Sequence, residues 1–126
     1  MTPPDQPPRV LVDTDTVLRA LLRKAETIDP RTAFMIRQNE RETGLSVNFD
    51  MTPEECRTQF KVTFGIRSLL VKSVNELDLK VAPDSARHAN ITGIPFVDDD
   101  PATAEFLAGQ LLKVSTLVSD GIVRNR

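Results

Sequence analysis

The sequence has one cysteine, one histidine and neither tryptophan nor tyrosine among its 126 residues. The single cysteine, Cys56, excludes a disulfide within the chain and a metal centre built from several thiolates of one chain. The absence of tryptophan and tyrosine removes the side chains that most often anchor tight protein interfaces. The core must therefore come from leucine, valine, isoleucine and six phenylalanines.

Long apolar runs are also absent, since no window approaches the roughly 20 apolar residues that cross a bilayer. The opening residues 1–5 have neither the basic nor the apolar region of a secretory signal. We therefore expect no membrane association and a cytoplasmic location. The formal charge of −2 disfavours nucleic-acid binding. Nucleic-acid binding through a local basic strip is therefore only a third hypothesis, after the two stated below. The strip would consist of Arg57, Lys61, Arg67 and Lys72.

The length and the 40% hydrophobic fraction suit one domain, which we place at residues 10–120. Residues 1–9 are rich in proline and predict a disordered tail. Residues 121–126 are assigned to a C-terminal tail that follows Asp120.

The first part of the chain gives mixed signals for secondary structure. Residues 10–25 have apolar side chains at helical spacing and predict a helix, although their β-branched content leaves a short strand open. Apolar runs predict strands over residues 32–37, 68–74 and 79–81, the last of them ending at Pro83.

Other segments carry clearer signals. Residues 45–50 alternate strictly between apolar and polar, which predicts a strand, and residues 88–95 predict another. Thr52 and Glu55 form a capping-box pattern for a helix that starts at Pro53 and ends near Gly65. Asp100 and Pro101 start an amphipathic helix that runs to Val118.

Together these segments predict an α+β fold. We expect a small mixed or antiparallel sheet of four to five strands packed against two to three helices, with a long C-terminal helix. The apolar sides of residues 45–49 and 104–118 are expected to share one core.

His88 is the candidate catalytic residue, because an imidazole can act as a general base near neutral pH. Asp84 and Ser85 lie too close to it in one loop for a predicted Ser-His-Asp triad. Four further residues are candidates for ligand binding, since arginines hold phosphates and the others offer hydrogen bonds. These are Arg19, Arg37, Ser46 and Asn90.

The remaining chemistry-bearing residues have structural interpretations. Asp98, Asp99 and Asp100 favour the positive end of the helix that follows rather than a cation. Cys56 is predicted to be a small buried apolar residue rather than a reactive thiolate. The sequence thus predicts no metal and no cofactor.

Three segments, in order Phe34-Met35-Ile36-Arg37, Gly44-Leu45-Ser46-Val47 and His88-Ala89-Asn90-Ile91 with Gly93 and Pro95, resemble a pattern in small uncharacterised bacterial proteins. The resemblance covers about residues 15–118. It implies a bacterial source and no particular activity.

Two functional hypotheses follow. The first is a domain that acts through a protein partner or as a homo-oligomer, because no catalytic motif is evident. The second is a small nucleotide- or NAD-binding enzyme that resembles the ADP-ribosyltransferase class. In that hypothesis Arg19 and Arg37 hold phosphates, Ser46 contacts a ribose and His88 orients the ligand. The sequence leaves open whether the chain is an enzyme.

Overall fold

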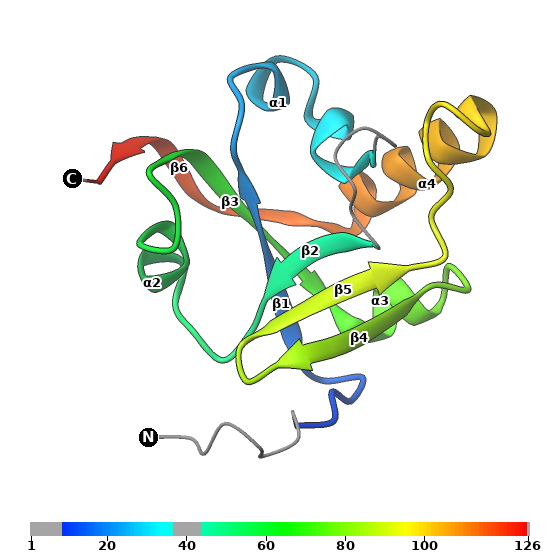
Figure 1. The fold of residues 1–126 in the computed structure, drawn as a ribbon, viewed down its shortest axis with the longest axis horizontal. Coiled ribbons are helices and arrows are strands. Elements are labelled where there is room, and N and C mark those ends of the chain that lie inside the picture. The colour runs from blue at the N-terminus through cyan, green and yellow to red at the C-terminus, as the bar shows by residue number, and fades with distance from the viewer. Residues whose placement is uncertain (1–8, 37–43, 126) are drawn as a thin grey trace.

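A computed structural model describes residues 9–36 and 44–125 of the chain. Its centre is a six-stranded sheet in the order β4-β5-β2-β1-β3-β6, in which all neighbouring strands are antiparallel (Figure 1). The elements along the chain are β1 (Thr16–Leu21), α1 (Ala25–Ile28), the 3₁₀ helix η1 (Pro30–Phe34), β2 (Leu45–Asn48), α2 (Pro53–Arg57), β3 (Val62–Leu70), α3 (Val71–Asn75), β4 (Lys80–Ser85), β5 (His88–Thr92), α4 (Pro101–Val114) and β6 (Thr116–Arg124).

The predicted fold is wrong in its proportions. The described residues form six strands instead of four to five, and four α-helices instead of two to three. Only α4, with 14 residues, is longer than five residues, and the last element is a strand instead of a long helix. No helix in the described part of the chain has the length and apolarity that a membrane crossing requires.

The predicted helix over residues 10–25 is wrong, and the short strand that the β-branched content left open forms instead, because β1 is apolar on both of its faces. Val17 and Leu21 pack into one core cluster, whereas Leu18 and Ala20 pack into a second cluster on the opposite side of the sheet. A strand that is buried on both faces has a continuous apolar run, and such a run imitates helical spacing.

The C-terminal helix ends earlier than its apolar spacing predicts. Ser115 has extended backbone angles, and its hydroxyl donates to the carbonyl of Leu112 at 2.7 Å, which ends α4. The chain then enters β6, which pairs with β3 along most of its length. Residues 121–124, assigned from the sequence to a tail, therefore lie in the sheet.

Other segments also differ from the prediction. The strand predicted over residues 68–74 ends at Leu70, after which α3 begins, and β4 continues past Pro83 to Ser85. Residues 30–34 form η1 instead of a strand, with Pro30 in its first turn. The helix that begins at Pro53 stops at Arg57, and Gly65 lies within β3. A Cβ on Gly65 would come within 3.1 Å of the carbonyl oxygen of Ser119, so glycine allows β6 to approach β3 closely there.

The clearest sequence signals are confirmed. The alternating segment forms β2, and β5 lies within residues 88–95. The capping box of α2 is complete, because Thr52 Oγ1 accepts from the Glu55 amide at 3.1 Å and the Glu55 carboxylate accepts from the Thr52 amide at 3.2 Å. The Asp100 carboxylate likewise accepts from the Thr103 amide at the start of α4.

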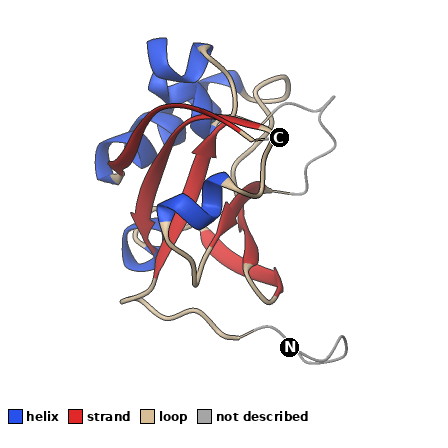
Figure 2. Ribbon diagram, turned by 90° about the vertical axis from the view of Figure 1, so that its left-hand side faces the viewer, coloured by secondary structure: helices blue, strands red, loops and turns tan. Residues whose placement is uncertain are grey.

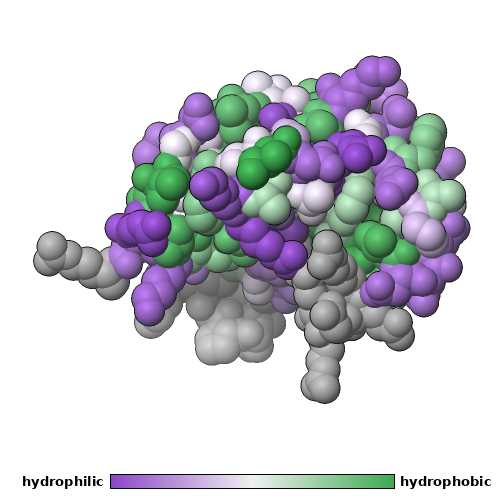
Figure 3. Space-filling view, turned by 90° about the horizontal axis from the view of Figure 1, so that it is seen from above, coloured by the Kyte–Doolittle hydropathy of each residue, from purple (hydrophilic) through white to green (hydrophobic). Residues whose placement is uncertain are grey.

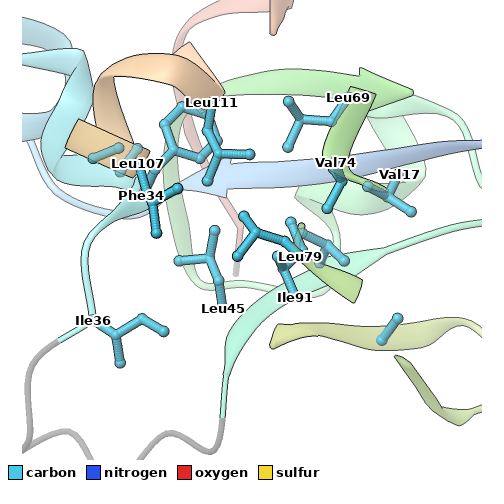
Figure 4. Packing of buried hydrophobic residues seen from close by; sticks show 14 of the residues in the cluster. Val17, Phe34, Ile36, Leu45, Leu69, Val74, Leu79, Ile91, Leu107 and Leu111 are labelled. Atoms are coloured by element: carbon cyan, nitrogen blue, oxygen red, sulfur yellow. The ribbon is translucent and has the colours of Figure 1, made fainter. Parts of the chain in front are cut away.

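The core lies on both faces of the sheet. The larger cluster lies between the sheet and η1, α3 and α4, and it joins Leu45 of β2 to Leu107 and Leu111 of α4 as predicted (Figure 4). The smaller cluster lies under α2 on the opposite face and contains Cys56 and Ile66 (Figure 2). One strand layer thus separates most of the helices from α2.

The N-terminal segment is attached to the sheet by Arg9. Its guanidinium binds the carboxylates of Asp15 at 2.9 Å and Asp50 at 2.7 Å, and it lies 5.5 Å from the ring centroid of Phe49. Hydrogen bonds from Arg9 lower the pKa of both aspartates. Arg9 was assigned to the tail, of which residues 1–8 lie outside the described part of the chain.

Arg9→Ala is expected to lower stability at neutral pH and to lose that effect in acid. Both aspartates have lower pKa values in the folded protein than in the unfolded chain. Their contribution is therefore complete above the unfolded value of about 4 and disappears as the pH falls through the lowered values. Urea midpoints of wild type and variant, compared from about pH 7 to pH 3, measure this. A deficit of equal size at both ends of the range would contradict the role of the ion pairs.

Candidate functional site

A pocket of about 400 Å³ opens where β1 and β2 separate. These neighbouring strands share a single residue pair, Leu18 with Asn48, whereas β1 and β3 share six pairs. Because the strands diverge beyond that pair, side chains rather than backbone hydrogen bonds fill the space between them. The separation of β1 and β2 thus creates the site.

The wall of the pocket is mainly polar on the side of β2 and β5. Ser46 and Asn48 alternate with core residues along β2, and the register places His88 of β5 opposite Asn48. Apolar residues also line the pocket, among them Phe60, which follows α2. Among residues 9–36 and 44–125, the lining consists of Arg19, Ala20, Leu22, Arg23, Glu26, Ser46, Asn48, Gln59, Phe60 and His88.

Arg19 bridges the gap between the two strands. Its Nη1 donates to the carbonyl of Ser46 in β2 at 2.8 Å, and its Nε donates to the carbonyl of Ala33 in η1 at the same distance. The guanidinium therefore replaces some of the missing hydrogen bonds between β1 and β2. It also leaves a fixed positive charge in the wall of the pocket.

Glu26 shapes the rim of the pocket at the end of β1. Its side chain is buried, and its Oε1 accepts from the backbone amides of Leu22 at 2.7 Å and Arg23 at 3.0 Å. These bonds fix the turn that carries Arg23 to the pocket. The sequence did not identify Glu26 or Arg23 as pocket residues. No sequence pattern indicates that the Glu26 carboxylate accepts from backbone amides three and four residues before it, and Arg23 depends on that turn.

His88 is held by a carboxylate. Its Nδ1 lies 2.7 Å from Oδ1 of Asp84, and the Asn90 amide donates to Oδ2 of the same carboxylate at 3.0 Å. Partial burial acts to raise the pKa of Asp84, but the hydrogen bond and the charge of His88, with the Asn90 amide, lower it overall. Asp84 and His88 are therefore in direct contact across the turn between β4 and β5.

Asn48 lines the pocket, and the buried Cys56 lies behind it. The Asn48 amide donates to the carbonyl of Arg87 at 3.3 Å, and its Oδ1 lies 3.8 Å from Sγ of Cys56. Burial raises the pKa of the Cys56 thiol to about 11, so the thiol stays protonated near neutral pH. Cys56 is thus a buried core residue, as predicted, and not a nucleophile of this pocket.

The predicted site residues are only partly brought together. Arg19, Ser46 and His88 line the same pocket, which meets the condition that one ligand must reach all three. Asn90 does not line it and instead binds Asp84. Arg37 lies outside the described residues. Sequence reasoning also missed Gln59 and Phe60, which reach the pocket only because α2 is short.

Two other candidate sites have structural explanations. Within the described residues, no three His, Cys, Asp or Glu side chains are grouped so that they could hold a metal. Asp100 caps α4 as expected. Arg57 does not belong to an exposed basic strip, because it is only 4% exposed and binds acceptors on β3 and β6.

Comparison with known proteins adds no relative: no protein-family model, curated protein or solved structure matches the chain. The pocket is therefore the feature from which a function can be inferred.

Proposed function

We propose that the protein binds a small anionic molecule, of the phosphate-bearing nucleotide kind, in the pocket between β1 and β2. One observation carries the proposal: two guanidiniums and several neutral hydrogen-bonding side chains line one pocket that also has an aromatic wall. The pocket has the size range typical of small-molecule sites. The proposal corresponds to the second of the two hypotheses from the sequence.

The charges in the pocket favour an anion. Arg19 and Arg23 contribute two positive charges, while Glu26, the one carboxylate among the described lining residues, directs an oxygen to two backbone amides. Arginine binds phosphate through a planar pair of donors, and such charge-assisted hydrogen bonds are stronger than neutral ones. Phe60 adds an aromatic side chain to the lining, and aromatic rings attract one another in stacked or edge-to-face pairs.

The neutral polar groups suit the rest of such a ligand. Ser46, Asn48 and Gln59 supply hydroxyl and amide groups along one side of the pocket. These groups can donate to or accept from ribose-like hydroxyls. A cytoplasmic location in a bacterium belongs to the same proposal, since a reducing compartment suits a chain whose one cysteine is free and buried.

Arg23→Ala is expected to weaken ligand binding about tenfold or more, because it removes one charge-assisted contact. Arg23 is exposed, so its replacement spares the core. Thermal-shift and calorimetric titrations with NAD, ADP-ribose, AMP and inorganic phosphate measure binding. Lys24→Ala is the matched control, because Lys24 is an exposed neighbour that does not line the pocket.

Two results would contradict the proposed binding site. One is that none of these four compounds binds the wild-type protein. The other is that Arg23→Ala and Lys24→Ala weaken binding equally, which would indicate attraction by general surface charge. A shift with NAD or ADP-ribose and none with phosphate would show that the neutral side chains recognise the ligand as well.

Binding of a protein partner is the second candidate function. Individual exposed apolar side chains favour it, although they do not form one continuous surface. Ile28 of α1 is 77% exposed and Phe106 of α4 is 63% exposed. Figure 3 shows the apolar side chains on the upper face as separate groups divided by polar ones, whereas a docking surface is usually contiguous. Light scattering after size-exclusion chromatography would detect self-association, and loss of that association in Phe106→Ser would support this candidate.

A further inference from the structure

The pocket is lined by His88, whose ring binds a carboxylate that is itself held by an amide. Asp84 uses one carboxylate oxygen for His88 Nδ1 and the other for the Asn90 amide. Asp84 lies at the irregularity in the pairing of β4 with β5, between Pro83 and Ser85, and its two hydrogen bonds connect it to β5. The carboxylate therefore cannot turn away from the imidazole without losing the bond to Asn90.

This geometry determines which nitrogen of the ring is basic. An ionised carboxylate only accepts hydrogen bonds, so Nδ1 of the neutral imidazole carries the proton. The lone pair then resides on Nε2. Nε2 has no hydrogen-bond partner among residues 9–36 and 44–125, and His88 is one of the residues that line the pocket.

We propose that His88 is a general base and that the pocket hydrolyses a small ester with an anionic group. The inference rests on the proposed binding of an anion. Nε2 takes a proton from a water molecule as the water oxygen bonds to the electrophilic atom of the ester. The bond to the leaving oxygen then breaks, and the imidazolium gives its proton to that oxygen. Asp84 is a positioning residue that stabilises the imidazolium.

The other groups near the pocket do not fit the role of base. The Cys56 thiol is buried and stays protonated near neutral pH. Glu26 is buried and binds two backbone amides. Arg19 and Arg23 have no basic lone pair at any accessible pH, but their charges favour the negative charge that develops on the ester.

The chain has one histidine, so its reactions can be assigned without ambiguity. Two esters serve as probes: neutral p-nitrophenyl acetate and anionic p-nitrophenyl phosphate. His88→Gln is expected to lower the hydrolysis rate about a hundredfold or more, the usual contribution of a general base. Asp84→Asn is expected to lower kcat with little change in KM, and Asp84→Glu to recover part of kcat.

Two controls separate positioning from general damage. Asp78→Asn makes the same chemical change at an exposed carboxylate outside the pocket, and Asn tolerates its φ of 61°. This control is expected to keep the wild-type rate. The ¹⁵N spectrum of the imidazole is expected to show the Nδ1-protonated tautomer in wild type and a mixture in Asp84→Asn.

The outcomes distinguish this proposal from the proposed binding function. If NAD, ADP-ribose, AMP or phosphate binds and neither ester is hydrolysed through His88, the catalytic proposal fails and the binding proposal stands. If His88-dependent hydrolysis occurs and none of the four ligands binds, the binding proposal fails in its choice of ligand. A neutral ring protonated on Nε2 in the wild-type protein would overturn the catalytic proposal even if every variant failed to fold.

Discussion

Arg57→Ala is expected to lower the free energy of unfolding by about 2–4 kcal/mol, which corresponds to a decrease in Tm of about 8–16 °C. The side chain is 4% exposed, and it joins α2 to two strands. Nε donates to Ser119 Oγ at 2.9 Å and Nη1 to Thr63 Oγ1 at 3.1 Å. The same guanidinium donates to the carbonyls of Gly121 at 2.8 Å and Asp120 at 3.0 Å.

The size of this effect follows from the number of acceptors that lose their donor. The carbonyls of Asp120 and Gly121 lie at the shift in register between β6 and β3. Regular strand pairing therefore does not supply backbone amides to take the place of the guanidinium there. Thr63 is fully buried, so its hydroxyl oxygen would lose a donor at a cost of about 1–3 kcal/mol, whereas water can reach the carbonyls of the exposed residues Asp120 and Gly121. Alanine would also leave a cavity under α2. Loss of these bonds is therefore expected to loosen β6 before the rest of the sheet.

Chemical denaturation with circular dichroism measures the free energy, and hydrogen exchange locates the change. Arg57→Lys keeps the charge and loses the planar set of donors, so it is expected to lose protection mainly in β6. Arg31→Ala is the control, because Arg31 is exposed and binds only a neighbouring aspartate among the described residues. Equal destabilisation by Arg31→Ala and Arg57→Ala would contradict the argument.

Phe34→Ala is expected to destabilise the protein by about 3–5 kcal/mol, the usual cost of emptying the site of a buried phenylalanine. Phe34 is fully buried at the end of η1. Figure 4 shows its ring beside Leu107 and Leu111 of α4, on the face of the sheet that holds the larger cluster. The change would therefore remove the contact that attaches η1 to α4.

Urea unfolding measures the loss of stability in Phe34→Ala. The dependence of the unfolding free energy on urea concentration is expected to stay unchanged, which would show that both proteins expose the same surface on unfolding. Ile28→Ala is the matched control on the adjacent α1. It removes an apolar side chain that is 77% exposed, so a change within about 0.5 kcal/mol is expected. A loss below 1 kcal/mol for Phe34→Ala would show that η1 is not part of the stabilising core.

The pocket depends on the same tertiary contacts as these two residues. η1 provides the Ala33 carbonyl that holds Arg19, and α2 ends at Arg57 two residues before Gln59 of the pocket wall. A variant that loosens either element is therefore expected to change ligand binding as well as stability. Binding studies should use substitutions on the pocket surface, such as Arg23→Ala, for this reason.

The sequence predicted those parts of the site that lie on regular strands. Ser46 alternates with core residues in β2, and His88 begins a segment that does form β5, so both side chains could be placed before the structure was known. Arg23 and Glu26 could not, because a turn carries them and only the folded backbone determines where that turn lies. Phe60 was expected on a helix and instead follows one that is five residues long.

Local chemistry by itself determined the start of α2, the start of α4 and the strand β2. Capping side chains and strict alternation act over a few residues and need no distant partner. Only the tertiary structure decided that β1 is a strand and that the chain ends in β6. Burial on both faces overrides the helical spacing of the first segment, and pairing with β3 extends the last one. The pocket is equally a tertiary property, because it exists where two strands of the sheet separate.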